Sequence, residues 1–145
     1  MRVILDTNVL LAALISPHRP PDTIYRAWRA GRFALVTSVL QLDELRRASR
    51  YPRLKAILPA HRVGTLVNHM QHANVLQALP PLPAGVEAAD PADTFLLQMA
   101  LASAAHYLVT GDRRAGLLQR GQLGTTRIVT PAGFCDEALE PPSGR

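Results

Sequence analysis

The sequence predicts an α/β fold, with a mostly parallel sheet of about five strands and helices on both faces. Short runs of adjacent apolar residues, typical of strands buried on both faces, alternate with longer segments of helical periodicity. Strands joined through helices pack side by side by right-handed crossovers, which makes the sheet parallel. The length of 145 residues and the hydrophobic content of 48% fit one domain, expected over residues 1–139, with a flexible tail at 140–145.

The N-terminal half is punctuated by residues that cap or break helices. Asp6 or Thr7 would cap the first helix, Asp22 the second and Thr37-Ser38 the third. The prolines and the glycine between these segments end or interrupt helices. The elements expected here are a strand at 3–5, helices at 9–15 and 22–30, a strand at 33–36, helices at 39–49 and 60–72, and a short strand at 74–76.

The C-terminal half resumes the alternation after a stiff, proline-rich connection at 79–85. Asp90-Pro91-Ala92-Asp93 opens a strongly apolar helix, expected at 94–105. The remaining elements are strands at 107–110 and 127–130 and a short helix that Pro131 begins and that ends at about residue 139.

Composition and charge narrow the class of protein. The formal net charge is +5, and 15 of the 16 basic residues are arginine. This excess suits RNA or DNA as a partner, although arginine-rich usage can also reflect genome composition. The single cysteine, Cys135, excludes an internal disulfide and fits a reducing cytosol. Because no apolar run is long enough to span a membrane and the start lacks a signal-peptide pattern, we expect a cytoplasmic protein without membrane association.

Acidic residues stand where the expected strands end or helices begin. Asp6 follows the first strand and Asp112 the fourth, and these strands would be neighbours in a doubly wound sheet. Asp93 lies at the mouth of a buried helix, and Glu44 lies two turns into the helix after the second strand. Each acid has a structural alternative: Asp6 as an N-cap, Asp93 as a helix-dipole partner, Asp112 as a turn residue and Glu44 as an ion-pair partner of Arg47.

Four carboxylates at one sheet edge would repel one another unless cations or protons compensate them. Oxygen-rich sites without histidine or cysteine favour Mg²⁺ or Mn²⁺. Such ions activate water and stabilise the charge that develops when a phosphodiester is hydrolysed. The convergence of acids on a basic protein therefore predicts metal-dependent hydrolysis of nucleic acid.

The pattern resembles the PIN-domain nucleases, and more closely the VapC-type toxin ribonucleases of toxin–antitoxin pairs. The likeness covers about residues 1–134, and its motifs are specific when taken together and in order. They are Val3-Ile4-Leu5-Asp6-Thr7-Asn8-Val9-Leu10, Thr37-Ser38 through Asp43-Glu44-Leu45, Asp90-Pro91-Ala92-Asp93-Thr94-Phe95-Leu96-Leu97, Ala105-His106-Tyr107-Leu108-Val109-Thr110-Gly111-Asp112 and Ile128-Val129-Thr130-Pro131-Ala132-Gly133-Phe134.

The resemblance implies a three-layer α/β/α sandwich, cleavage of RNA and dependence on Mg²⁺ or Mn²⁺. It also implies a homodimer and a cognate antitoxin protein that covers the site. Residue by residue, it makes Asp6, Glu44, Asp93 and Asp112 the catalytic and metal-binding acids, supported by Asn8, Asp90 and Thr110.

Two departures from the family pattern concern charge near this site. Relatives often continue with another acid after the Thr-Gly-Asp motif, whereas this chain has Arg113 and Arg114, which would place two positive charges beside the pocket for phosphate. Position 92 is alanine where an acid is common, so Asp90 and Asp93 are the acids that remain there.

The remaining candidates for binding or catalysis are a basic run, a histidine pair and the single cysteine. Arg46, Arg47, Arg50, Arg53 and Lys55 form the densest basic run, either a solvated helix end or a contact for the RNA backbone. His69 and His72 have metal-ligand spacing but no third ligand nearby, and Cys135 lacks a catalytic base.

Two other functions stay open. A PIN-like domain could bind RNA or protein without catalysis. An aspartyl-phosphate phosphatase with Asp6 as nucleophile is the less favoured alternative, because many such enzymes carry a second aspartate where this chain has Asn8.

Overall fold

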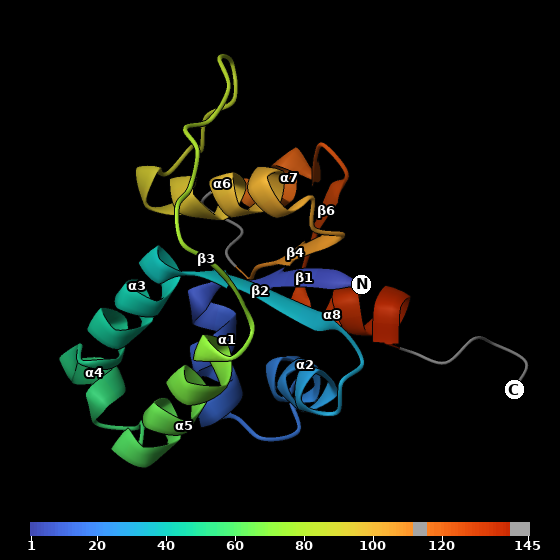
Figure 1. Ribbon diagram of the computed structural model, residues 1–145. Helices are drawn as coiled ribbons and strands as arrows, with labels where there is room; N and C mark the ends of the chain where they lie inside the picture. The colour runs from blue at the N-terminus through green and yellow to red at the C-terminus, as the bar shows by residue number, and fades with distance from the viewer. Residues whose placement is uncertain (112–115, 140–145) are drawn as a thin grey trace, which may run out of the picture.

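A computed structural model describes residues 1–111 and 116–139 (Figure 1). Its strands form one sheet in the order β3-β2-β1-β4-β6-β5, in which only the β5–β6 pair is antiparallel. The strands are β1 (Arg2–Leu5), β2 (Ala34–Ser38), β3 (Asn74–Leu76), β4 (Tyr107–Val109), β5 (Gln122–Leu123) and β6 (Thr126–Val129). The helices are α1 (Thr7–Ile15), α2 (Pro20–Arg29), α3 (Val39–Ser49), α4 (Pro52–Lys55), α5 (Ala60–Gln71), α6 (Thr94–Ser103), α7 (Leu117–Arg120) and α8 (Pro131–Phe134), with a 3₁₀ turn η1 (Pro91–Asp93) and a π-helical turn η2 (Cys135–Leu139).

The sheet separates two apolar layers, so the predicted α/β sandwich is confirmed. Helices α6 and α7 cover one face, and the other face is covered by a larger group that includes α1, α2 and α8 (Figure 1). Successive residues of β1 serve both layers: Val3 and Leu5 pack into the larger cluster, and Ile4 packs into the smaller one. All three side chains are buried, which explains why this strand shows no alternation of apolar and polar residues.

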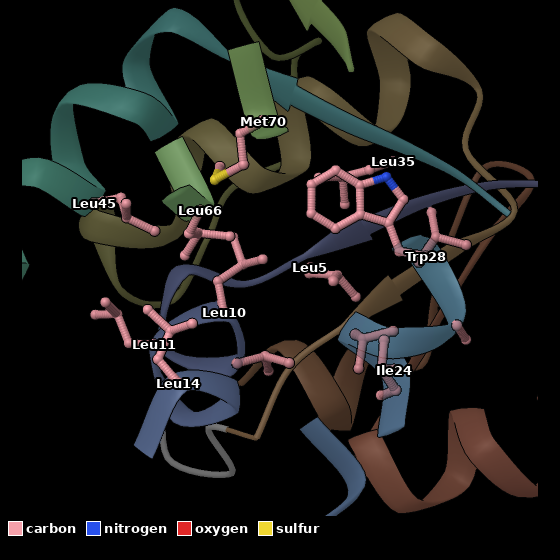
Figure 2. Close-up of a cluster of buried hydrophobic side chains, with 14 of the residues drawn as sticks. Leu5, Leu10, Leu11, Leu14, Ile24, Trp28, Leu35, Leu45, Leu66 and Met70 are labelled. Carbon is pink, nitrogen blue, oxygen red and sulfur yellow. The ribbon is translucent and has the colours of Figure 1, made fainter. Parts of the chain in front are cut away.

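The larger cluster fixes the helices that follow β1 and β2. Figure 2 shows leucines of α1, among them Leu10 and Leu14, converging with Leu45 of α3 and with Leu66 and Met70 of α5. Leu45, Leu66 and Met70 are fully buried. Because buried side chains from three helices interlock here, the position of α3 relative to the end of β1 is set by packing.

The central strand pair lies as the doubly wound prediction requires. β1 is paired in parallel with β4, and Leu5 lies opposite Val109 in the register. The ladder continues past both strands, since the Asp6 N–H donates to the carbonyl of Val109 at 2.9 Å and the Thr110 N–H donates to that of Val129 at 3.0 Å. The residues that follow β1 and β4 therefore meet at the carboxyl edge of the sheet.

The structure adds elements that the sequence did not predict. Strand β5 has two residues, too few to show a period, and forms a hairpin with β6 through a turn in which Gly124 has a φ of +57°. The four-residue helices α4 and α7 and the turn η1 were likewise missed.

The start of the second helix was predicted wrongly. Helix α2 begins at Pro20, and its two prolines occupy the first turn, where a missing N–H costs nothing. Asp22 lies inside that first turn, where its carboxylate accepts a hydrogen bond from the His18 N–H at 2.9 Å and pairs with Arg26 at 3.1 Å. Among the described residues, no helix is long and apolar enough to cross a membrane.

Candidate active site

Asp6 lies at the point where β1 passes into α1. It occupies the N-cap position of α1, yet its side chain makes no capping hydrogen bond. Its Oδ2 atom instead accepts a hydrogen bond of 2.7 Å from the hydroxyl of Thr110, which follows β4. Asp6 is only 7% exposed, and Thr110 is fully buried. The side chain is therefore held toward the neighbouring strand rather than toward the end of its own helix, which argues against a mere capping role.

Glu44 reaches the same edge from α3. Ser38 caps this helix, as predicted, because its hydroxyl accepts a hydrogen bond of 3.1 Å from the Gln41 N–H. Two turns in, the Oε2 atom of Glu44 accepts a hydrogen bond of 2.8 Å from the hydroxyl of Thr7. Thr7 immediately follows Asp6 in the chain. The carboxylate of Glu44, bound by Thr7, is therefore brought close to the carboxylate of Asp6.

Burial raises the pKa of Glu44 above its ordinary value of 4.5, and the hydrogen bond from Thr7 opposes this shift. The negative charge of Asp6 raises the Glu44 pKa further, and the positive charge of Arg47 lowers it. The two acids are thus close enough to repel each other in a poorly hydrated place. Arg47 is near enough to lower the Glu44 pKa, but the group that binds the Glu44 carboxylate directly is the hydroxyl of Thr7.

Gln41 is a positioning residue that the sequence reasoning missed. It is fully buried, its side-chain amide donates to the carbonyl of Leu5 at 2.7 Å, and its Oε1 atom accepts from the hydroxyl of Thr37 at 2.7 Å. These bonds tie the first turn of α3 to the last residue of β1. The available signal was a glutamine three residues before Glu44, on a helix whose other inward residues are apolar.

Asp93 and Asp90 lie on the segment that leads into α6. The Asp90 carboxylate accepts a hydrogen bond of 2.9 Å from the Ala92 N–H and so caps η1, the turn that carries Asp93. Asp93 is half-buried and makes no capping hydrogen bond to α6. A hollow of about 240 Å³ lies between α3 and the segment around Asp93. Helix α3 lines it with Leu40, Glu44 and Arg47, and the segment around Asp93 lines it with Ala92 and Phe95. The beginning of α6 therefore faces Glu44.

The remaining predicted residues are only partly placed. Asp112, Arg113 and Arg114 lie outside the described residues. Asn8 is an exposed residue in the first turn of α1. Among the predicted RNA contacts of α3, Arg47 lines the hollow beside Glu44, Arg46 pairs with Asp43 at 3.5 Å, and Arg50 is exposed.

The donor chemistry of this edge fits a hard divalent cation. The groups brought there are carboxylate and hydroxyl oxygens, and the repulsion between Asp6 and Glu44 is of the kind that a bound cation relieves. Within residues 1–111 and 116–139, no group of three or more histidine, cysteine, aspartate or glutamate side chains stands close enough to hold a metal ion. A metal site with three carboxylate ligands would therefore need either Asp112 as one ligand or a closer approach of the described acids to one another.

The alternative zinc pair finds other partners. His69 Nδ1 shares a hydrogen bond of 3.0 Å with the hydroxyl of Tyr25, and His72 Nδ1 lies 2.7 Å from the carbonyl of Asn68. Burial lowers the pKa of His69, as do the nearby charges of Arg29 and His72. The two imidazoles thus belong to separate local networks.

Comparison with protein-family models gives a match over most of the chain. The family model described as PIN domain matches residues 2–114. This range includes Asp6, Glu44 and Asp93, and also the segment that contains Asp112. No curated protein matches the chain at a significant level.

Proposed function

Because this chain belongs to the PIN-domain family, whose members are generally nucleases, we propose that it is a metal-dependent endoribonuclease. We further propose that it acts as the toxin of a type II toxin–antitoxin pair, as a homodimer that a cognate antitoxin inhibits. The observation that carries the nuclease assignment is the pair of bonds at the carboxyl edge of the sheet. Thr110 holds Asp6 and Thr7 holds Glu44, so two mutually repelling acids are oriented at one place.

Asp6, Glu44, Asp93 and Asp112 would hold Mg²⁺ or Mn²⁺ in this proposal. The ion would supply Lewis-acid activation of water and compensation of the negative charge that develops at the scissile phosphate. The hydroxyls of Thr110 and Thr7 orient the two described carboxylates, since each donates a short hydrogen bond to one oxygen. Arg47, beside Glu44 in the hollow, would attract the phosphate backbone.

Cleavage of RNA by the purified protein tests the assignment. We expect no cleavage of a labelled single-stranded RNA after treatment with EDTA, and cleavage inside the strand once Mn²⁺ or Mg²⁺ is in excess. A homodimer would show in sedimentation equilibrium. Binding of RNA without cleavage under any metal condition would favour the non-catalytic alternative, and a phosphoprotein formed from a small phosphodonor would favour the phosphatase.

The toxin role has its own test in cells. Induced synthesis of the wild-type protein is expected to arrest growth, and co-expression of the protein encoded by a small adjacent reading frame is expected to restore it. Growth that continues normally while the soluble, RNA-cleaving protein accumulates would contradict the toxin role and leave the nuclease assignment intact.

The substitution Thr110→Val tests whether orientation of Asp6 matters. It removes the hydroxyl that donates to Asp6 but nearly preserves side-chain shape, so we expect cleavage to fall by about 10–100-fold. Loss of the buried hydrogen bond should also destabilise the fold by about 1–3 kcal/mol. Thr126→Val is the matched control, because the buried Thr126 donates to the carbonyl of Ala105 at 2.6 Å, away from the acids. Equal losses of cleavage by the two folded variants would contradict the role of Thr110.

A further inference from the structure

A groove of about 490 Å³ lies between α3, α4 and α5, away from the carboxylate edge. Its volume falls within the range of ligand-binding clefts. These three helices are neighbours in the arrangement of Figure 1. The groove is lined by Arg46, Ser49, Arg50, Lys55, Leu58, Ala60, Val63, Gly64, Val67, Asn68 and Gln71.

The charge of the groove is one-sided. Arg46 and Arg50 of α3 and Lys55 of α4 contribute three cations, and none of the described residues that line the groove is acidic. Arg46 forms an ion pair with Asp43, whereas Arg50 and Lys55 are both exposed. The groove is therefore suited to a ligand that carries negative charge along one side.

The opposite wall is apolar and offers room for a flat group. Leu58, Val63 and Val67 provide aliphatic surface, and Gly64 stands in the middle of α5, where a side chain would normally favour the helix. A Cβ atom built at Gly64 would meet nothing within 4 Å. The helix backbone is thus open to close approach at the place where the groove runs along it.

Polar groups continue this wall. The groove is also lined by Asn68 and Gln71. An amide side chain has both donor and acceptor groups, as recognition of a base edge requires. Tyr51 does not line the groove, but it follows Arg50 in the chain and is 57% exposed. A planar, anionic, hydrogen-bonding ligand matches all of these groups.

Arginines connect the groove with the carboxylate edge. Arg47 lines the hollow that contains Glu44, and Arg50, three residues further along α3, lines the groove. Side chains three apart on a helix are surface neighbours, with about 5–6 Å between their Cβ atoms. A strand of nucleic acid can therefore follow continuous positive charge around α3 from Glu44 to the groove.

We propose that this groove is a nucleobase subsite for single-stranded RNA on one side of the scissile bond. An unpaired base lies on the α5 wall over Gly64, and Arg50 and Lys55 bind the adjoining phosphates. The subsite rests on the proposed ribonuclease function and extends it, because it predicts that unpaired nucleotides beside the cleavage point strengthen binding. An acidic helix is the competing occupant, but it would not explain why arginines lead from the groove to Glu44.

Binding measured without metal tests the subsite independently of cleavage. The probe is a fluorescein-labelled, single-stranded RNA of mixed sequence, titrated in EDTA and followed by anisotropy. Gly64→Leu fills the wall and is favourable for the helix, so thermal stability should not fall, while the Kd for RNA should rise about tenfold. The double variant Arg50→Gln/Lys55→Gln should weaken binding and reduce the slope of log Kd against log salt by about 1.4. Arg19→Gln, an exposed cation outside the groove, is the control for general charge and should leave the Kd within about twofold of wild type.

The outcomes separate the alternatives. An unchanged Kd for Gly64→Leu would overturn the base subsite, even if the charge variants bind more weakly. Displacement of the RNA from wild type by a synthetic acidic amphipathic peptide, abolished by Gly64→Leu, together with equal affinity of both proteins for RNA, would assign the groove to a protein partner. Normal binding with the predicted losses, but no cleavage after Mn²⁺ is added, would contradict the nuclease function and leave the binding site standing.

Discussion

Replacement of Asp6 by asparagine is expected to reduce RNA cleavage by about 1,000-fold or more. Asparagine keeps an oxygen that can accept the hydrogen bond from Thr110, but it lacks the charge proposed to hold the metal ion. In the metal-free protein the substitution also removes the repulsion between Asp6 and Glu44, so thermal stability should be equal to wild type or higher. Cleavage assays with Mn²⁺ and thermal denaturation in EDTA measure the two effects.

Asp22→Asn is a matched control for Asp6→Asn. Asp22 is 6% exposed and Asp6 is 7% exposed, so the two acids are equally buried. The charge of Asp22 is paired with Arg26, and its loss should therefore lower stability while leaving cleavage by the folded protein unchanged. Opposite patterns in the two variants would separate a site acid from a structural acid. Unchanged cleavage by purified Asp6→Asn protein would contradict the catalytic assignment.

Glu44→Gln is expected to lower cleavage by about 100-fold and to flatten the pH dependence of metal-free stability. The pKa of Glu44 lies above its ordinary value of 4.5, so the folded protein binds more protons than the unfolded chain between these two pKa values. Stability therefore falls as pH rises through that window, and glutamine, which does not titrate, removes this contribution. Thermal denaturation from pH 4 to pH 7 in EDTA measures the difference.

In EDTA at pH 7, Glu44→Gln should be more stable than wild type, and addition of Mn²⁺ should reverse this order. A ligand that binds only the folded state at 100 times its Kd stabilises it by about 2.7 kcal/mol, and wild type should gain more than Glu44→Gln. The exposed neighbour Asp43 is the control, since Asp43→Asn should gain the same stabilisation from Mn²⁺ as wild type does. If Glu44→Gln gained the full wild-type stabilisation, Glu44 would not be a metal ligand.

The fold was largely predictable because its signals are local. Val3, Ile4 and Leu5 form a run that only a strand buried on both faces explains, and Ser38 caps α3 as its position indicates. The proximity of residues that follow β1 and β4 came from the topology of doubly wound sheets, and the pairing of these strands confirms it. Strand β5 could not be found in this way, since two residues carry no period.

The site was less predictable because its contacts are long-range. Nothing in the local sequence of Thr7 shows that its hydroxyl turns to Glu44 rather than caps its own helix. The buried Gln41 likewise depends on where the last carbonyl of β1 lies after the sheet has formed. Sequence patterns singled out the acids as candidates, whereas the hydroxyls and the amide that orient Asp6 and Glu44 followed only from packing.

The pairing of Asp6 with Thr110 also constrains when the proposed nuclease site can form during synthesis. The two residues are 104 positions apart in the chain, so a ribosome that adds about 5–20 residues per second needs roughly 5–20 s to make the second after the first. Until then β1 can pair with β2 but has no β4 beside it, and Asp6 lacks the Thr110 hydroxyl that orients it. In a nascent chain the proposed nuclease site would therefore stay unformed until Thr110 has been made and β4 has paired with β1.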